Sequence, residues 1–362
     1  MKIHRAVMAV FVFVWCSEGI AQSSGSNPED IVKKLESLEK NNANLEHRLD
    51  ALSKAVDDVL WYHKAGDVAR IDKVFMAGPP PAKEKNPTAM GAGNPVKFWS
   101  YAFIPKSRDP NKKLPLLLLP HGGVHADFTT YHTHIIRELM AQGYAVVAPE
   151  YRGSTGYGKA FYEKIDYGGL EVEDCHAGMK YMLENYGFLD SRRVGVIGWS
   201  HGGMIALLSV FAHPEDYAVA FAGVPVSDLV ARMGYTDEEY QGFFSADYHL
   251  GKTAEENVAE YRKRSPAWNA AKLKTPLLIH TNTIDEDVNV LEVEHLIQAL
   301  KAEGKAFEYE IFQNLPGGHS FDRMDTKKAK EIRLRIYRFL AKHLSPPKPL
   351  ETLEDLEKAA YR

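Results

Sequence analysis

One stretch, residues 192–208, restricts the fold more than any other part of the chain. It reads RRVGVIGWSHGGMIALL: an apolar strand pattern, a glycine-rich turn, and the start of an apolar helix. A strand that is apolar on both faces is typical of a parallel sheet, which helices must cover on both sides. The stretch therefore predicts an α/β protein.

The same alternation of apolar runs and helical patterns continues on both sides of this stretch. Strands are expected at residues 96–105, 114–123, 144–153, 192–198, 219–225, 275–282 and 307–312, and helices at about 131–143, 167–186, 204–213 and 325–343. This order predicts a mostly parallel, twisted sheet with helices on both faces, over residues 96–345. Residues 346–362 are expected to be a C-terminal tail.

A polar and aromatic segment at 228–268 interrupts the alternation. In a sheet that binds its ligand at the carboxyl ends of its strands, an insertion at this place overhangs the site. We expect it to be helical and to contribute to a substrate pocket. The alternative is a surface segment that does not contact the substrate.

The composition excludes some classes of partner. The 362 residues are 45% hydrophobic and 25% charged, with a formal net charge of −4. These values are typical of an ordinary soluble protein and do not favour nucleic acid or an anionic membrane.

The first 22 residues resemble an export signal. A basic start, MKIHR, precedes the ten-residue apolar run AVMAVFVFVW, and small residues follow at Gly19 and Ala21. We expect a signal peptide over residues 1–21, cleaved after Ala21, and a periplasmic or secreted bacterial protein. The alternative is an uncleaved membrane anchor. Cys16 would leave with the signal, so Cys175 would be a lone, buried thiol.

A heptad pattern follows the leader, in a segment expected to be helical over residues 29–62. Apolar residues recur at alternating spacings of four and three, with Asn42 as the one polar member: Ile31, Leu35, Leu38, Asn42, Leu45, Leu49, Leu52, Val56 and Val59. This spacing predicts a coiled coil that joins copies of the chain through residues 31–59. The alternative is one amphipathic helix packed on the main domain. The proline- and glycine-rich run within 63–95 is expected to be a linker.

The turn GWSHG at 198–202 has the pattern of a nucleophile elbow, which presents a serine between a strand and a helix. Two partners are needed later in the chain, first an acid and then a histidine. Asp285 follows one predicted strand, with Glu286 and Asp287 adjacent as alternative acids, and His319 follows the next strand. Ser200, Asp285 and His319 are therefore expected at one edge of the sheet. Ser200 would attack a carbonyl, His319 would move its proton and Asp285 would orient His319. The backbone N–H of His201, at the helix start, is expected to bind the oxyanion.

Four other histidines are crowded at His121, His125, His132 and His134. They lack a recognised ligand spacing, so no metal and no cofactor are expected.

Six motifs together resemble the catalytic domain of the prolyl oligopeptidase family of serine peptidases. They are PHGGVHADF (120–128), YAVVAPEYRGSTGYGKAF (144–161), GWSHGG (198–203), RSPAWNA (264–270), LLIHTNTIDEDV (277–288) and GGHSF (317–321). The resemblance implies the α/β-hydrolase fold over about residues 95–345. It also selects Asp285 as the acid, because the family's acid lies three residues before a valine, here Val288.

The chain departs from the family pattern in two respects. Family members usually carry a large N-terminal β-propeller, and the short, helix-rich segment before residue 95 does not fit one. Some members use a tyrosine as the second oxyanion donor, whereas this chain has His121, Gly122 and Gly123 at that turn. The resemblance therefore leaves the second donor to a backbone N–H of Gly122 or Gly123.

Three functions are compatible with the sequence. The resemblance favours a peptidase that hydrolyses short peptides through an acyl-enzyme; a carboxylesterase on the same scaffold is the alternative. A non-catalytic, exported coiled-coil binding module is the third. The aromatic residues expected to line a substrate pocket outside the insertion are Trp199 and Tyr157. Those within the insertion, which would line the pocket or else form the insertion's own core, are Tyr235, Tyr240, Phe243, Phe244 and Trp268.

Overall fold

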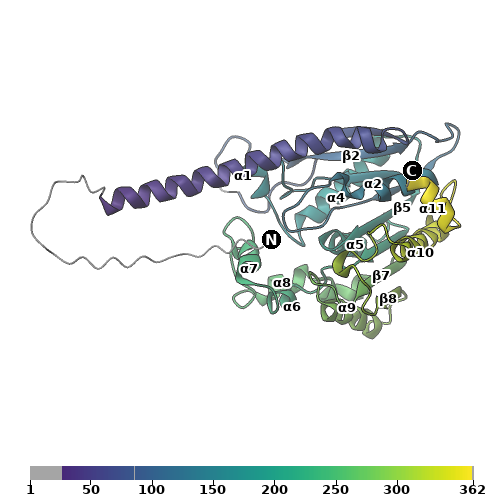
Figure 1. Ribbon diagram of the computed structural model, residues 1–362. Coiled ribbons are helices and arrows are strands. Elements are labelled where there is room, and N and C mark those ends of the chain that lie inside the picture. The colour runs from purple at the N-terminus through teal and green to yellow at the C-terminus, as the bar shows by residue number, and fades with distance from the viewer. Residues whose placement is uncertain (1–26, 85, 361–362) are drawn as a thin grey trace, which may run out of the picture. The chain divides into compact units, whose positions relative to one another are not determined.

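The computed structural model describes residues 27–84 and 86–360 (Figure 1). The leader expected at residues 1–21 lies outside these ranges. The chain divides into two compact units, residues 1–45 and 46–362. One long helix, α1 (Pro28–Ala65), begins in the first unit and ends in the second.

The described residues of the second unit contain one eight-stranded sheet. Its strands are β1 (Ala69–Ala77), β2 (Lys97–Pro105), β3 (Leu114–Leu118), β4 (Ala145–Pro149), β5 (Leu189–Trp199), β6 (Val219–Gly223), β7 (Leu277–Asn282) and β8 (Glu308–Phe312). The order is β1-β2-β4-β3-β5-β6-β7-β8, and pairing is antiparallel only at β1–β2 and β2–β4. The predicted mostly parallel sheet is confirmed.

Helices cover both faces of the sheet (Figure 1). The longer ones are α2 (Thr133–Gln142), α4 (Leu170–Asn185), α5 (His201–Ala212), α9 (Val290–Ala302), α10 (Lys327–Leu344) and α11 (Leu353–Ala360). Side chains of α4, α5 and α9 pack into one apolar core, and side chains of α2, α10, α11 and the end of α1 pack into a second core. This arrangement is that of an α/β-hydrolase, as expected.

The linker prediction for residues 63–95 needs correction at its first half. Residues 69–77 form β1, which pairs with β2 along its whole length, from Ala69 opposite Pro105 to Ala77 opposite Lys97. Charged residues within ARIDKVFMA hide its strand pattern in the sequence, since an edge strand keeps one side in water. The tail prediction for 346–362 also needs correction, because α11 packs its Leu356 into the core.

The segment 228–268 is helical, as expected. It contains α6 (Leu229–Met233), α7 (Glu238–Ser245) and α8 (Val258–Arg264). Cys175 on α4 is a free, buried thiol, and burial raises its pKa well above the usual value. None of the helices in the described part of the chain combines the length and the apolar side chains that a membrane span requires.

Candidate active site

Ser200 lies on a strained turn between β5 and α5. Its φ is 60° and its ψ is −125°, a conformation that residues with a side chain rarely adopt. The turn leaves no room for a side chain at either glycine. A Cβ at Gly198 would lie 2.1 Å from the carbonyl oxygen of Gly202, and a Cβ at Gly202 would lie 2.4 Å from the carbonyl oxygen of Pro120. The neighbouring strand end also fixes the turn, since the Ser200 N–H donates to the Gly223 carbonyl at 3.0 Å. The fold therefore holds this serine in one partly exposed position at the end of β5.

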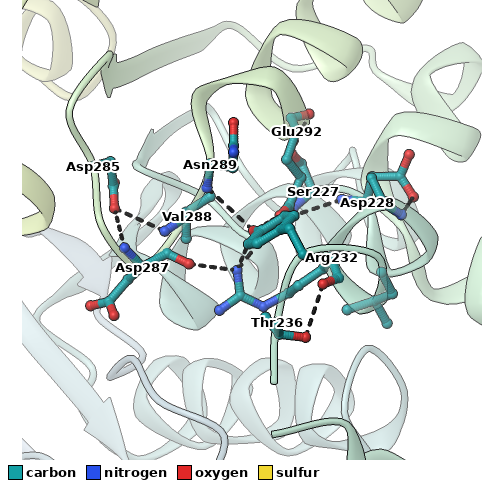
Figure 2. A network of polar contacts seen from close by, with 12 residues as sticks. Ser227, Asp228, Arg232, Thr236, Asp285, Asp287, Val288, Asn289 and Glu292 are labelled. Atoms are coloured by element: carbon teal, nitrogen blue, oxygen red, sulfur yellow. Dashed lines mark hydrogen bonds and ion pairs between the residues drawn. The ribbon is translucent and has the colours of Figure 1, made fainter. Parts of the chain in front are cut away.

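His319 and Asp285 meet in the loops that follow β8 and β7. Nδ1 of His319 lies 2.9 Å from both carboxylate oxygens of Asp285. The carboxylate of Asp285 is fully buried, and its Oδ1 accepts the N–H groups of Asp287 and Val288 (Figure 2). A carboxylate at Nδ1 places the proton of a neutral imidazole on that nitrogen, which leaves Nε2 free to accept one.

Two neighbouring acids have different roles in this geometry. Asp287 is 64% exposed, and its carboxylate lies 3.9 Å from Nε2 of His319, the opposite ring nitrogen. Glu286 accepts the backbone N–H of His319 at 3.0 Å. Asp285 is thus the carboxylate placed to orient the imidazole, while Glu286 holds the histidine backbone.

The three residues lie at the same edge of the sheet. Ser200 follows β5, Asp285 follows β7 and His319 follows β8, and these strands run parallel through β6. Open α/β sheets bind their ligands at this carboxyl edge. Among the described residues, no hydrogen bond joins Ser200 to His319. In enzymes without a bound substrate, the contact between nucleophile and base is often too long for a hydrogen bond.

The turn at 120–123 lies beside the serine. A Cβ at Gly122 would lie 3.3 Å from the Cβ of Ser200 and 3.9 Å from its Oγ, and Gly123 has a φ of +85°. Nδ1 of His201 lies 2.8 Å from the Gly123 carbonyl oxygen. The first residue of α5 is therefore tied to this turn, and both candidate sources of oxyanion donors keep a fixed distance from Ser200.

Sequence reasoning used only the backbone of His201 and missed the function of its side chain. The buried ring stacks on Tyr167, with centroids 3.7 Å apart, and its Nε2 lies 3.2 Å from the Glu171 carboxylate. The Tyr151 hydroxyl donates to the His121 carbonyl at 2.9 Å and braces the same turn. Glu171 and Tyr151 are distant in sequence from the elbow, so no local pattern identifies them.

A profile of the prolyl oligopeptidase family matches residues 130–346. The chain belongs to the prolyl oligopeptidase family. It is 28% identical over 255 residues to an acylamino-acid-releasing enzyme of Arabidopsis thaliana, an alignment that covers 69% of this chain and 33% of that protein. It is 30% identical over 232 residues to an uncharacterized peptidase of Bacillus subtilis strain 168, covering 64% of this chain and 34% of that one. The chain thus spans about a third of the length of these relatives.

Solved structures show the same fold. A crystal structure of a puromycin hydrolase superposes with a TM-score of 0.63 and 22% sequence identity, over 78% of this chain and 41% of that one. The α/β-hydrolase fold of this prolyl oligopeptidase family member is therefore shared with a known hydrolase.

The aromatic residues expected in a pocket lie in different places in this family member. Trp199 is buried, and its Nε1 donates to Asp322 at 2.7 Å, so it connects β5 to the loop that carries His319. Tyr157 lines a small cavity over β1 and β2, with Phe75 and Trp99. Phe244 is completely buried and packs against Tyr167, which places it in the apolar core that α4, α5 and α9 share.

Tyr235 and Tyr240 join a polar network between the insertion and the Asp285 loop. Figure 2 shows Arg232 of this network bonded to the backbone of Asp287. Arg232 of α6 donates to the Tyr240 hydroxyl at 2.6 Å, to the Tyr235 hydroxyl at 2.9 Å and to the Asp287 carbonyl at 3.0 Å. The Tyr235 hydroxyl donates in turn to the buried carboxylate of Glu292 at 2.6 Å. Burial raises the pKa of Glu292, and Arg232 opposes that rise. The insertion therefore supports the loop of the acid.

Of the crowded histidines, His121 is buried and the other three are partly buried. Burial lowers the pKa of His121 and His132 to about 3, and that of His125 and His134 to about 4. Within the described residues, the groups that could hold a metal lie elsewhere, around His213 and Asp216. Ser200 precedes the start of α5 and His213 follows its end. The 12 residues of this helix, about 18 Å in length, therefore separate His213 from the serine.

Proposed function

We propose that Ser200, His319 and Asp285 form the catalytic triad of a serine peptidase that hydrolyses short peptides. One observation carries the proposal: a fully buried carboxylate is bound to Nδ1 of His319 at the sheet edge where Ser200 is presented on a strained turn. Membership in the prolyl oligopeptidase family supports an amide rather than an ester as the natural substrate.

The proposed reaction has two half-steps. Oγ of Ser200 attacks the peptide carbonyl while Nε2 of His319 takes its proton, and the same proton then passes to the leaving amine as the C–N bond breaks. The acyl group remains on Ser200 as an ester. Water attacks that ester, His319 accepts the proton of the water and returns a proton to Oγ, and the peptide acid leaves. Asp285 stays ionised and stabilises the imidazolium.

The oxyanion of each tetrahedral intermediate needs two donors. The N–H of His201 is one, because it is the first amide of α5 and points from the positive end of that helix. The N–H of Gly122 or Gly123 is the other, since this turn lies against Ser200. The His201 ring supports both donors through its contact with the Gly123 carbonyl.

A matched substrate pair tests the proposal. One N-blocked Ala-Pro acyl group is presented as an aryl amide and as an aryl ester, and kcat/KM is measured for both with the natural chain and with Ser200→Ala. We expect turnover of the amide that the variant loses. Ester turnover with an amide rate thousands-fold lower would make the enzyme a carboxylesterase. Turnover that survives in the variant would exclude Ser200 as the nucleophile.

We also propose that the chain is exported, with its signal cleaved after Ala21. The basic start, the apolar run and the small residues of the leader support this. N-terminal sequencing of the protein from its native host should begin at Gln22. A sequence that begins at Met1 would contradict cleavage.

A further inference from the structure

Helix α1 carries two stripes of side chains, and the fold uses one of them. In the second unit, Lys54 donates to the Phe128 carbonyl and pairs with Glu150. Asp57 accepts from the Thr130 N–H at 3.0 Å and from its hydroxyl at 2.6 Å.

The same stripe continues to the end of the helix. Trp61 is completely buried and stacks on Phe128, with centroids 5.4 Å apart and planes 7° from parallel. Ala65 is completely buried as well. This stripe of residues 54, 57, 61 and 65 attaches the helix to the domain, because its spacing of three and four follows one helix face.

The heptad residues form the other stripe, and they are exposed. The eight apolar members, residues 31, 35, 38, 45, 49, 52, 56 and 59, have exposed fractions between 45% and 69%. Leu49 and Leu52 belong to the second unit, and their side chains are nevertheless 63% and 62% exposed. With these residues at heptad positions a and d, Lys54, Asp57 and Trp61 occupy f, b and f, on the opposite face. The domain therefore leaves the seam open.

An apolar seam of this length in water needs a partner. Scattered apolar residues are normal on a surface, but a contiguous stripe over four heptads marks a binding face. The packed stripe already accounts for the contact of α1 with its own domain, so that contact does not explain the seam.

We propose that the seam binds the same seam of a second copy, as a parallel, in-register, two-stranded coiled coil. Asn42 favours this arrangement. In a parallel pair each a residue faces its own copy, so the two Asn42 amides can bond to each other. In an antiparallel pair, a residues face d residues, and Asn42 would bury an unpaired amide against an apolar side chain, at a cost of about 1–3 kcal/mol.

The flanking charges suit the same pairing. A g residue contacts the following e residue of the partner in a parallel coil, which pairs Lys34 with Glu39. The next two g–e pairs, Asn41 with Glu46 and Arg48 with Ser53, contain no like charges. The residues of α1 that contact the domain occupy positions b, c and f, which lie on the outer face of a two-stranded coil. The domains of the two copies therefore leave the seam free for pairing.

The particle mass of the full chain tests the proposal. Leu38→Glu/Leu45→Glu places two charges at d positions, and Ser37→Glu/Asn44→Glu places the same two charges on exposed neighbouring positions outside the seam. Light scattering should give twice the chain mass for the natural chain and the control, and the single chain mass for the seam variant. A monomeric natural chain, a trimer or tetramer, or a seam variant that stays dimeric would overturn the proposal.

Cross-linking tests the orientation. Leu35→Cys should form a disulfide-linked dimer on mild oxidation, because parallel pairing brings the two a positions together. Antiparallel pairing over residues 31–59 would place them about 30 Å apart, at about 1.5 Å per residue. Ser37→Cys, outside the seam, is the control. The natural chain, whose Cys175 is buried, gives the baseline amount of disulfide-linked dimer that its own cysteines form. A dimer in which Leu35→Cys links no better than Ser37→Cys would contradict the parallel arrangement.

Discussion

Asp285 and Asp287 are two residues apart, and their carboxylates lie in different environments. The first is fully buried, accepts two backbone N–H groups and contacts Nδ1 of His319. The second is mostly exposed and lies nearest to Nε2, the nitrogen that must stay free for the serine proton. At the scale of single residues, the chemistry proposed for the site depends on this difference in burial.

Replacing each aspartate by asparagine separates the two. Asp285→Asn should reduce kcat by about 10⁴-fold with little change in KM, because an amide at Nδ1 stabilises the wrong tautomer of the imidazole. Asp287→Asn should change kcat less than a few-fold. The measurement is kcat and KM on the aryl amide, with circular dichroism to verify folding. Equal losses in both variants would exclude the assignment of Asp285.

At the scale of elements, α6 of the insertion supports the loop that carries the acid. Arg232 is 6% exposed at its side chain and Glu292 is fully buried, and the two lie 3.6 Å apart. Glu292 also accepts the Asp228 N–H at 3.1 Å, which ties the start of α6 to α9. Through these contacts and the bond from Arg232 to the Asp287 carbonyl, the insertion is a structural support of the proposed site.

Arg232→Leu should destabilise the protein by about 3–5 kcal/mol, because it leaves the Glu292 carboxylate buried without its cation. Lys263→Leu, at a side chain that is 75% exposed in the same insertion, should change the free energy of unfolding by less than about 1 kcal/mol. Urea unfolding measures both. Adding Glu292→Gln to Arg232→Leu should recover part of the loss; no recovery would mean that the uncompensated charge is not the cause.

At the scale of the whole molecule, burial lowers the pKa of three buried histidines, His121, His249 and His280, to about 3. His280 on β7 is a clear case: its ring packs edge-on against Phe221 and Phe312, with both centroids 5.3 Å away. Burial lowers its pKa to about 3, from an ordinary value of 6.5. Between these two values the unfolded chain binds a proton that the folded chain does not, so this histidine's contribution to stability is present above pH 6.5 and is lost as the pH falls.

His280→Phe removes this proton linkage. The free energy of unfolding of the natural chain minus that of His280→Phe should rise with pH between about 4 and 6.5, by up to about 1.4 kcal/mol per pH unit, and then become constant. Phe312→Leu is the control, because a loss of packing without a titrating group should give a difference that does not change with pH. A flat difference for His280→Phe would show that this ring binds a proton as readily in the folded as in the unfolded protein, so its pKa is not lowered by folding.

Most of the fold could be predicted because its signals are local. Apolar runs that end in glycine turns identify buried parallel strands, and the order of Ser200, Asp285 and His319 after three of those runs places them at one edge of the sheet. The edge strand β1 was missed because it keeps charged residues on its exposed side. Helix α11 was missed because its short amphipathic pattern becomes stable only when Leu356 packs into the core.

The sequence by itself determined the class of fold, the elbow and the heptad seam, since each depends on spacing along the chain. Only the tertiary structure decided which carboxylate is buried against His319, that the His201 ring holds the Gly123 turn, and that the side chains of α1 opposite the seam are the ones that attach it to the domain. These depend on contacts between residues about 30 to 80 positions apart. Burial and pairing of that kind arise when distant segments pack, and no pattern of neighbouring residues encodes them.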